Sequence, residues 1–406
     1  MHPPAARENL SVAEAETEIA RCMPGLPVER VALDAAAGRI LREAVNANRD
    51  QPAFDRVTMD GIAFAFEDWQ QGIVEFPIAG IQAAGRPPLS RTQPGHCFEV
   101  MTGAVLPRDC DCVAPVEEVI LANGVARLAP GANPRRMQYV HRRGSDYVDG
   151  ARLLEPGMLL RGPELAVLAS AGRTQVSVAS QPRIAIITTG DELVAVDAAI
   201  EEHEVRRSND RAMAAALRLR GITQVDRAHV PDNPERLRQA IGELLEDHSV
   251  LILSGGVSMG KFDHVPQALA DLGVAVIFHK VRQRPGKPMW FGIGGGGQVV
   301  FALPGNPVSS LVCLHRFVLP ALEAAAGAKP AVRLTVRLAR QVEFEPALTW
   351  FLPVRIERNL VEAQAEPVFT NTSGDFARLA GSDGFVELPA VQQRFAAGYA
   401  APLYCW

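Results

Sequence analysis

The chain is poor in aromatic residues, which make up 6% of its 406 positions. Proteins that bind single-stranded nucleic acid stack bases on aromatic side chains, so this composition argues against a base-stacking surface. The net charge of −5 also argues against a general nucleic-acid binder. Basic residues nevertheless cluster between His279 and Lys287, and at Arg206, Arg207 and Arg211. An anion site is therefore compatible with an acidic chain.

Cysteine and histidine motifs for metals are missing. None of the six cysteines stands in a Cys-x-x-Cys pair, and no His-x-x-x-His pair occurs, which excludes a zinc ribbon and a thioredoxin motif. On a strand, Cys110 and Cys112 would point to one face, as buried free thiols. The lack of a disulfide-like pattern favours the cytosol.

Long apolar runs are also missing. No stretch of about 18 apolar residues exists, so no membrane-spanning helix is expected. The N-terminal segment carries Glu8, Glu14, Glu16 and Glu18 and no apolar core, so no secretory signal is expected. With 48% hydrophobic and 21% charged residues, the chain is predicted to be globular. Its length suggests about two to four domains.

The N-terminal part combines one helix with a region of short strands. Ser11 and Glu14 form a capping box that predicts a helix over residues 9–22. A strand from Val28 and a helical segment to Ala44 are expected next.

Residues 51–140 carry frequent Pro and Gly between short Val, Ile and Phe runs, with a hairpin signal at Asn123-Gly124. We expect a small β domain there. A helix is predicted at 163–171, with Gly172 at its end.

Strands and helices alternate from residue 181 to 327. The predicted strands are 183–188, 225–230, 250–253, 274–281, 289–293 and 298–303, and the helices 210–220, 234–247, 265–272 and 307–326. This alternation predicts a mostly parallel sheet covered by helices on both faces. Ser208 and Asn209 are expected to cap the first helix. Residues 328–406 return to short alternating segments, typical of a small β-sandwich or barrel.

Polar segments follow the ends of these predicted strands. They are Thr189 to Glu192, Pro231-Asp232, Ser254 to Gly256, Arg284 to Pro288 and Pro304 to Ser309. Parallel sheets bind ligands at the carboxyl ends of their strands, so we expect one ligand site there. In Leu251 to Asp263, glycines lie directly after an apolar strand, which lets a ligand approach the backbone.

Acidic and basic side chains in these segments suit a metal and an anion. Glu192, Asp232 and Asp263 are candidate Mg²⁺ ligands, although each could be a helix cap or a solvated charge. Lys280, Arg284 and Lys287 are candidates for holding an anion; an exposed basic loop is the alternative.

Pro304 to Ser309 offers backbone N–H groups as an anion cradle, or is a plain helix start. Asp60 and Asp146 stand in two further acidic motifs outside the α/β region. Either residue could form only an Asx turn.

Together these motifs resemble the MoeA family of molybdopterin molybdenumtransferases, which includes the E domain of gephyrin. The matching segments are QPAFDRVTMDGIA at 51–63, MTGAVLP at 101–107, RRGSD at 142–146, TTGDEL at 188–193, SND at 208–210, SGGVSMGKFD at 254–263, RPGKP at 284–288 and LPGNPVSS at 303–310. Their joint order makes the resemblance specific.

The resemblance implies a multidomain α/β plus β fold with four domains. They are an elongated discontinuous domain (1–50 and 141–180), an inserted small β domain (51–140), a three-layer α/β molybdopterin-binding domain (181–327) and a C-terminal β-barrel (328–406). It also implies a cytoplasmic homodimer. Each active cleft would lie between the α/β domain of one subunit and the β domain of the other, with Asp60 and Thr102 acting in trans.

The implied reaction inserts molybdenum from molybdate into adenylylated molybdopterin and releases AMP, with Mg²⁺ as cofactor. The resemblance assigns catalysis to Asp60, Asp146, Asp263 and Lys287, and metal binding to Glu192, Asp232 and Asp263. It assigns substrate binding to Thr102, Gly190, Asp191, Ser208, Asn209, Ser254, Gly255, Gly256, Ser258, Lys280, Arg284, Pro304, Gly305, Asn306 and Ser309. Many family members have lysine at the position of Arg284.

Two other functions stay open from the sequence. One is a molybdopterin adenylyltransferase, which shares the α/β domain but needs neither the inserted β domain nor the barrel. The other is a non-catalytic molybdopterin carrier or scaffold. Candidate partners are the adenylyltransferase and the proteins that mature molybdoenzymes; neither nucleic acid nor a membrane is expected.

Overall fold

A computed structural model describes residues 7–257, 263–330, 332–358 and 363–406. The chain divides into two compact units, which we describe separately. The first comprises Met1–Glu43, Pro156–Gly162 and Gln175–Trp406, and the second comprises Ala44–Glu155 and Pro163–Thr174.

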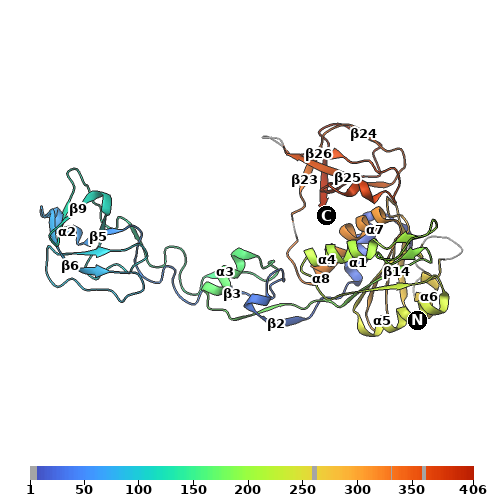
Figure 1. Ribbon diagram of the computed structural model, residues 1–406, viewed down its shortest axis with the longest axis horizontal. Helices are drawn as coiled ribbons and strands as arrows, with labels where there is room; N and C mark the ends of the chain where they lie inside the picture. The colour runs from blue at the N-terminus through green and yellow to red at the C-terminus, as the bar shows by residue number, and fades with distance from the viewer. Residues whose placement is uncertain (1–6, 258–262, 331, 359–362) are drawn as a thin grey trace. The chain divides into compact units, whose positions relative to one another are not determined.

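The first unit is built on a seven-stranded sheet (Figure 1). Its order is β1 (Arg7–Leu10), β19 (Ala275–Val281), β21 (Trp290–Ile293), β22 (Val299–Leu303), β18 (Val250–Ser254), β14 (Ile184–Thr189) and β17 (Val225–Val230). Only β21 runs antiparallel to its neighbours; the other pairs are parallel. Every residue of β14, β18 and β22 is buried, as expected for central strands of a parallel sheet.

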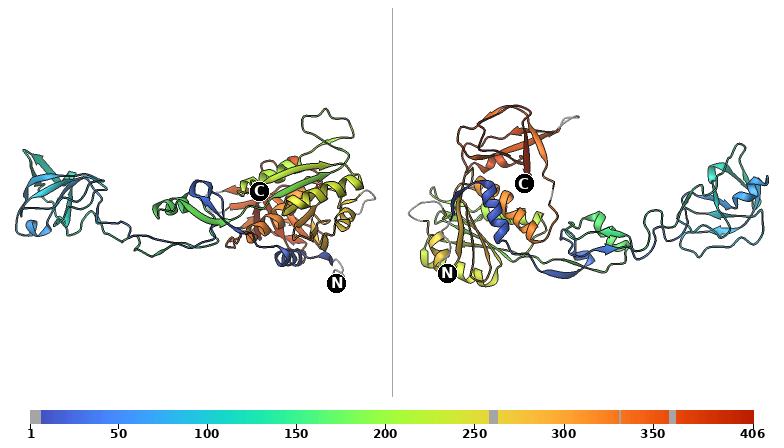
Figure 2. Two further views of the ribbon diagram at one scale, coloured as in Figure 1. Left: turned by 90° about the horizontal axis from the view of Figure 1, so that it is seen from below. Right: turned by 180° about the vertical axis from the view of Figure 1, so that it is seen from behind.

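Helices cover both faces of this sheet (Figure 2). The helices on one face are α1 (Val12–Cys22), α4 (Asn209–Leu219), α7 (Pro307–Cys313) and α8 (Leu319–Ala325), and those on the other are α5 (Pro234–Asp247) and α6 (Val265–Asp271). Side chains of β14 point alternately to the two faces of the sheet. Ile186 therefore packs in the core beneath α1, α4, α7 and α8, and Ile187 packs in the core beneath α5 and α6. Burying each such side chain contributes about 1.5–3 kcal/mol. The predicted three-layer α/β domain is confirmed.

Two details of the helices differ from expectation. The closing helix is interrupted between α7 and α8 by a π-helical turn, Leu314–Val318. Ser208 is the N-cap of α4, but its side chain makes no capping hydrogen bond, so the predicted cap is wrong. In contrast, Ser11 and Glu14 form the predicted capping box of α1.

The run Pro307–Ala325 is long and apolar enough to cross a membrane by length and composition alone, although 78% of its window is buried. It packs against the sheet as a core helix.

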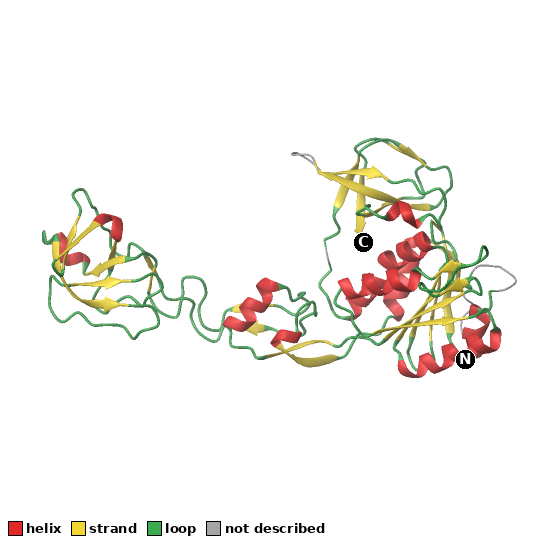
Figure 3. Ribbon diagram, viewed as in Figure 1, coloured by secondary structure: helices red, strands yellow, loops and turns green. Residues whose placement is uncertain are grey.

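The C-terminal part of the first unit is a closed five-stranded barrel. Its order is β25 (Thr349–Arg358), β26 (Ala363–Pro367), β23 (Thr335–Leu338), β29 (Ala400–Cys405) and β27 (Gly384–Leu388), which pairs again with β25. Figure 3 shows it as strands and loops with one short helical turn, η4 (Phe376–Leu379). A two-residue strand, β20 (Gln283–Arg284), joins β25 and fixes a loop of the α/β domain against the barrel.

The second unit contains a six-stranded sheet. Its order is β8 (Cys112–Pro115), β5 (Gly61–Phe64), β7 (Cys97–Val100), β6 (Glu75–Gln82), β10 (Val125–Leu128) and β9 (Val119–Ala122). Asn123 and Gly124, with φ of 53° and 76°, form the predicted hairpin turn between β9 and β10. The short helix α2 (Phe66–Gln70) packs beside it.

The cysteines of this unit are buried free thiols, as predicted. The prediction that Cys110 and Cys112 share one strand face is wrong. Cys110 precedes β8 and packs with Val57 and Phe98, whereas Cys112 packs with Phe64 and Phe76 in a separate core. Cys110 ends a turn that starts at Pro107, before β8 begins, so the strand alternation on which the prediction depended does not apply to it.

Segments before and after the β domain pair as antiparallel ribbons. The pairs are β2 (Val28–Ala32) with β13 (Gln175–Ala179), β3 (Val45–Asn46) with β12 (Arg152–Leu154), and β4 (Arg56–Val57) with β11 (Val140–His141). The helix α3 (Gly162–Ser170) follows, and Gly172 lies just beyond it with φ of 71°. The predicted fold class is confirmed, whereas the boundaries of the four domains stay a prediction.

The helical segment predicted up to Ala44 is wrong. Only a 3-10 turn, Leu33–Ala35, forms there. Ile40 then bridges to Leu159 and Leu41 bridges to Val178, so tertiary pairing overrides the helix propensity of the alanines at 35–37.

Candidate active site

Four parallel strands of the first unit, β14, β17, β18 and β22, end at the same edge of the sheet (Figure 1). The loops after Thr189, Val230, Ser254 and Leu303 therefore meet there. We call these loops, together with Arg284–Pro288, the carboxyl edge. The sequence predicted that these segments would converge, and hydrogen bonds connect them in pairs.

Acidic side chains join the ends of β14 and β17. The Thr189 hydroxyl donates to Oδ1 of Asp232 at 2.5 Å, and the backbone N–H of Asp232 donates to Oδ1 of Asp191 at 3.0 Å. A Cβ at Gly190 would lie 2.6 Å from Oε2 of Glu192, so this carboxylate folds over the glycine. Three predicted site acids, Asp191, Glu192 and Asp232, thus stand on adjacent strand ends.

Asn209 ties three loops of the carboxyl edge together. Its amide nitrogen donates to the Ser254 hydroxyl oxygen at 2.9 Å and to the Gly305 carbonyl at 2.7 Å. Ser310, buried beneath them, donates to the Pro304 carbonyl. Asn209 was expected to cap α4; instead it holds the loop after β18 against the loop after β22.

Glycines let these loops approach closely. Gly255 has φ of 103°, and a Cβ there would lie 2.7 Å from the Thr189 carbonyl oxygen. Gly256 has φ of 65°, and its Cβ would lie 2.6 Å from Val265. A Cβ at Gly305 would lie 3.4 Å from the Cα of Gly255. Both positive φ values favour glycine, so the two residues after β18 are required by the backbone itself.

A buried glutamine holds the loop Arg284–Pro288 in place by a hydrogen bond. Gln283 is fully buried, and its amide donates to the Gly286 carbonyl at 3.1 Å and to Sγ of Cys313 at 3.3 Å. A Cβ at Gly286 would lie 2.6 Å from that sulfur. Arg284 and Lys287 are exposed on the loop. This loop is therefore a fixed support that presents two cations.

Lys280 stands apart from that pair. It has φ of 71°, an unusual conformation for a strand residue, and its Nζ lies 3.7 Å from Oε2 of Glu8 on β1. The predicted basic trio is thus divided: Lys280 faces an acid of the neighbouring strand, while Arg284 and Lys287 lie on the loop.

A residue of the C-terminal part of the unit forms hydrogen bonds to the loop Pro304–Ser309. The Val308 N–H donates to the Ser373 carbonyl at 3.1 Å, and the Asn306 amide donates to the Ser373 hydroxyl at 2.7 Å. Ser309 is buried, at 3% exposure. One donor of the predicted backbone cradle therefore already has a partner, and the barrel segment helps to shape this loop.

Asp263 is half-buried and directly precedes His264, the N-cap of α6. Ser258, also predicted as a site residue, lies outside the described residues. Among the residues that the structure describes, no three His, Cys, Asp or Glu side chains converge as a ready metal site. The acids Glu192 and Asp232 suit Mg²⁺ because that ion commonly binds one or two carboxylates and completes its shell with water and phosphate.

In the second unit, Asp60 is held by Thr102. The Asp60 carboxylate accepts hydrogen bonds from the Thr102 N–H at 2.6 Å and from its hydroxyl at 2.8 Å. These two bonds lower the pKa of Asp60 below its ordinary value, so it is a carboxylate at neutral pH. Beside it is a cavity of about 230 Å³, lined partly by Ile62, Glu99 and Met101.

Asp146 is oriented by a histidine of fixed tautomer. An Arg56 N–H donates to Nδ1 of His141 at 3.0 Å, because an arginine can only donate. The neutral ring therefore carries its proton on Nε2, which donates to Oδ1 of Asp146 at 2.8 Å. The two predicted catalytic acids of this unit are thus both held by donors, which is more than an isolated Asx turn requires.

Sequence reasoning missed several residues of these arrangements. They are Thr189, Ser310, Gln283, Glu8 and Arg56. Thr189, Ser310 and Arg56 stand inside segments that match the family, so their side chains could have been included. Glu8 pairs with Lys280, which is distant in sequence, and Gln283 acts through its burial, so the sequence has no local signal for these two.

Models of three protein domains match consecutive parts of the chain. They are the MoeA N-terminal region (domain I and II) over residues 10–172, the probable molybdopterin binding domain over 185–324, and the MoeA C-terminal region (domain IV) over 335–406. Together they span nearly the whole described chain.

Full-length relatives agree with these matches. A molybdopterin molybdenumtransferase of Synechocystis sp. is 40% identical over 402 residues, covering 98% of this chain and 100% of the relative. The chain belongs to the molybdopterin molybdenumtransferase family. A family member from Staphylococcus epidermidis is 29% identical over 97% of this chain and 94% of its own.

A solved structure shares the architecture. The molybdopterin biosynthesis MoeA protein of Pyrococcus horikoshii matches with a TM-score of 0.79 at 27% identity, covering 98% of this chain and 99% of that one. The resemblance inferred from the motifs is thus confirmed at the level of the molybdenumtransferase family. Because these relatives are molybdopterin molybdenumtransferases, the adenylyltransferase and carrier alternatives are not favoured.

Proposed function

We propose that this chain is a molybdopterin molybdenumtransferase. It takes molybdate and adenylylated molybdopterin, breaks the bond to AMP, and leaves molybdenum on the dithiolene. The observation that carries the proposal is the carboxyl edge. There Asn209 joins Ser254 to Gly305 and Thr189 joins Asp232, on a chain 40% identical throughout to a molybdenumtransferase.

Acids of the carboxyl edge would hold Mg²⁺ against the pyrophosphate link. Glu192 and Asp232 lie on adjacent strand ends, and Asp263 precedes α6. The ion would supply charge stabilisation as AMP leaves. Asp232→Asn should then raise the Mg²⁺ concentration for half-maximal turnover, whereas Asp247→Asn, at the far end of α5, should not. Equal Mg²⁺ requirements in the two variants would contradict this role of Asp232.

Cations of the carboxyl edge would hold molybdate and the pterin phosphate. Arg284 and Lys287 project from the loop fixed by Gln283, and the Ser309 carbonyl oxygen lies 3.7 Å from the Cβ position of Gly286 on that loop. Lys280, which faces Glu8, would supply a further positive charge. A tetrahedral dianion needs fixed positive charge and N–H donors, which a loop anchored in this way supplies. Gly190, Gly255, Gly256 and Pro304 would shape the backbone around the substrate.

Assembly would complete the cleft. We propose a cytoplasmic homodimer in which Asp60 and Thr102 of one subunit act with the carboxyl edge of the other. The Thr102 donors keep Asp60 anionic, and His141 orients Asp146, so both acids are ready to accept a proton or a hydrogen bond from substrate.

The proposal is tested by incubating the protein with adenylylated molybdopterin, Mg²⁺ and molybdate, and measuring AMP. A folded dimer that releases no AMP above background would contradict the proposed function. Asp263→Asn separates an enzyme from a carrier: an enzyme loses turnover while still binding the pterin, and a carrier loses little. ATP consumption with bare molybdopterin would instead indicate an adenylyltransferase.

A further inference from the structure

The guanidinium of Arg284 is oriented by an aromatic side chain of the barrel. Its central carbon lies 5.9 Å from the ring centroid of Phe344, within the range of a cation–π contact. Within the described residues, this side chain makes no hydrogen bond or ion pair besides that contact. Its N–H groups are therefore available to a ligand while one face lies over the ring.

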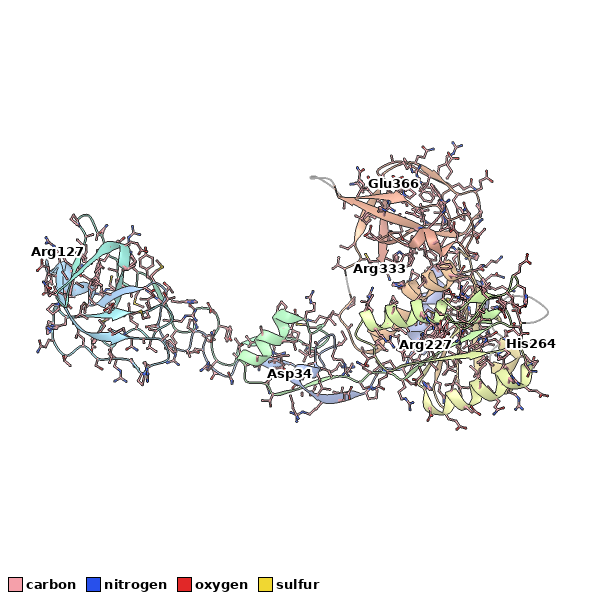
Figure 4. The ribbon with its side chains drawn as sticks, viewed as in Figure 1. Asp34, Arg127, Arg227, His264, Arg333 and Glu366 are labelled. Carbon is pink, nitrogen blue, oxygen red and sulfur yellow. The ribbon has the colours of Figure 1, made fainter. Side chains whose placement is uncertain are left out.

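Phe344 is itself held in a column of rings. It stacks on Trp350 with centroids 4.7 Å apart and an interplanar angle of 16°, and Trp350 stacks on Phe369 at 6.5 Å. At the other end of this column, the guanidinium carbon of Arg340 lies 5.3 Å from the ring centroid of Phe369. Arg340 also forms an ion pair with Glu366, which is labelled in Figure 4. Phe344 is only 9% exposed, so its ring is a fixed surface.

The backbone of Arg284 is fixed by the same part of the barrel. β20 pairs in parallel with β25, which places Arg284 opposite Trp350, the residue on which Phe344 stacks. The neighbouring Gln283 is buried and bonded beneath the loop. Backbone and side chain of Arg284 are thus both held by the barrel, although the residue belongs to the loop after β19.

We propose that Phe344 is a positioning residue for oxoanion binding, acting through Arg284. The planar guanidinium would otherwise rotate freely on a long side chain. The ring restricts it to orientations in which one face is covered, and a tetrahedral dianion can then accept two of its N–H groups. Restricting the side chain before binding lowers the entropy lost on binding. This role rests on the proposed function, which places molybdate at this loop.

The experiment compares Phe344→Leu with Phe344→Trp and with Phe395→Leu as a control. Phe395 is also buried in the barrel, where its ring packs against Tyr399, so its loss tests damage to the barrel. Thermal unfolding confirms that each variant is folded.

Phe344→Leu should raise the KM for molybdate about fivefold while kcat changes less than about twofold, as expected for a lost cation–π contact. Phe344→Trp should stay close to the wild type, because it keeps an aromatic face. In an Arg284→Lys background the effect of Phe344→Leu should shrink, because the two residues act as a pair.

An unchanged KM in Phe344→Leu, or an equal rise in Phe395→Leu, would overturn the proposal. Calorimetric titration of the full-length protein with molybdate gives a second readout that needs no turnover. If the wild type binds molybdate but releases no AMP, the proposed function is refuted. The role of Phe344 is then tested only by the change in the dissociation constant of molybdate in Phe344→Leu. A wild type that binds no molybdate in either assay overturns both.

Discussion

The side-chain amide of Asn209 donates to the hydroxyl oxygen of Ser254 at 2.9 Å and so ties the start of α4 to the end of β18. The same nitrogen reaches the Gly305 carbonyl. One side chain thus sets the spacing between the two loops on which the proposed cleft depends.

Replacing Asn209 by alanine should therefore impair both stability and turnover. The lost hydrogen bonds should lower the free energy of unfolding by about 2 kcal/mol. Misplaced loops should reduce kcat/KM roughly a hundredfold. The control is Ser11→Ala, which removes the cap of α1 at a cost of about 1 kcal/mol and should leave kcat/KM unchanged. Comparable losses of activity in both variants would show that Asn209 acts only through stability.

The glycine after β18 offers a second test. Gly255→Ala places a Cβ 2.7 Å from the Thr189 carbonyl oxygen at φ of 103°. The strain should cost about 1–3 kcal/mol and displace the loop. Gly295→Ala is the matched control, because no atom lies within 4 Å of its Cβ position; its free energy of unfolding should change by less than about 0.5 kcal/mol. Denaturant unfolding measures both, and a Gly255→Ala protein as stable as the control contradicts the geometry.

Thr102 should control the pH dependence of turnover through Asp60. Its two hydrogen bonds stabilise the carboxylate and lower the pKa of Asp60. Thr102→Val removes the hydroxyl donor, so the pKa should rise toward its ordinary value. The acidic limb of the kcat/KM profile should then move to higher pH, while Thr102→Ser keeps it in place. An acidic limb unaffected by Thr102→Val would mean that Asp60 is not the group that titrates.

His315 should make the first unit sensitive to acid. Burial lowers its pKa from 6.5 to about 4, while its Nδ1–H donates to the Cys405 carbonyl. Between those values the unfolded chain takes up a proton that the folded protein does not, so stability falls as pH falls. Wild type should lose about 2 kcal/mol more than His315→Gln between about pH 7 and about pH 5.

Denaturant unfolding at the two pH values measures this difference. Because every other titrating group is shared by the two proteins, the comparison isolates the histidine. Parallel losses of stability in wild type and His315→Gln would show that His315 is protonated in the folded state.

The α/β domain could be predicted closely from the sequence because its central strands, β14, β18 and β22, are buried apolar runs followed directly by Gly or Pro. β17 and α5 have the predicted bounds. In the second unit, the predicted hairpin turn at Asn123-Gly124 is also present, with the positive φ values expected of it. The segment to Ala44 failed because local helix propensity competes there with strand bridges to Leu159 and Val178.

The site was predictable at the level of loops but not of contacts. The strand-end rule identified Asp232 and the family resemblance identified Asn209, but nothing local to their motifs shows that Thr189 and Ser254 are their partners. Phe344 illustrates the limit most clearly. It is separated from Arg284 by 60 positions of chain (344 − 284), and only the closing of the barrel brings the two together.

The most direct test of the central claim is a single-turnover measurement of AMP released from adenylylated molybdopterin, with and without molybdate. We expect one AMP per bound substrate, released faster as the molybdate concentration increases, and little release from Asp263→Asn. AMP release that is absent, or that does not depend on molybdate, would contradict molybdenum transfer at the carboxyl edge.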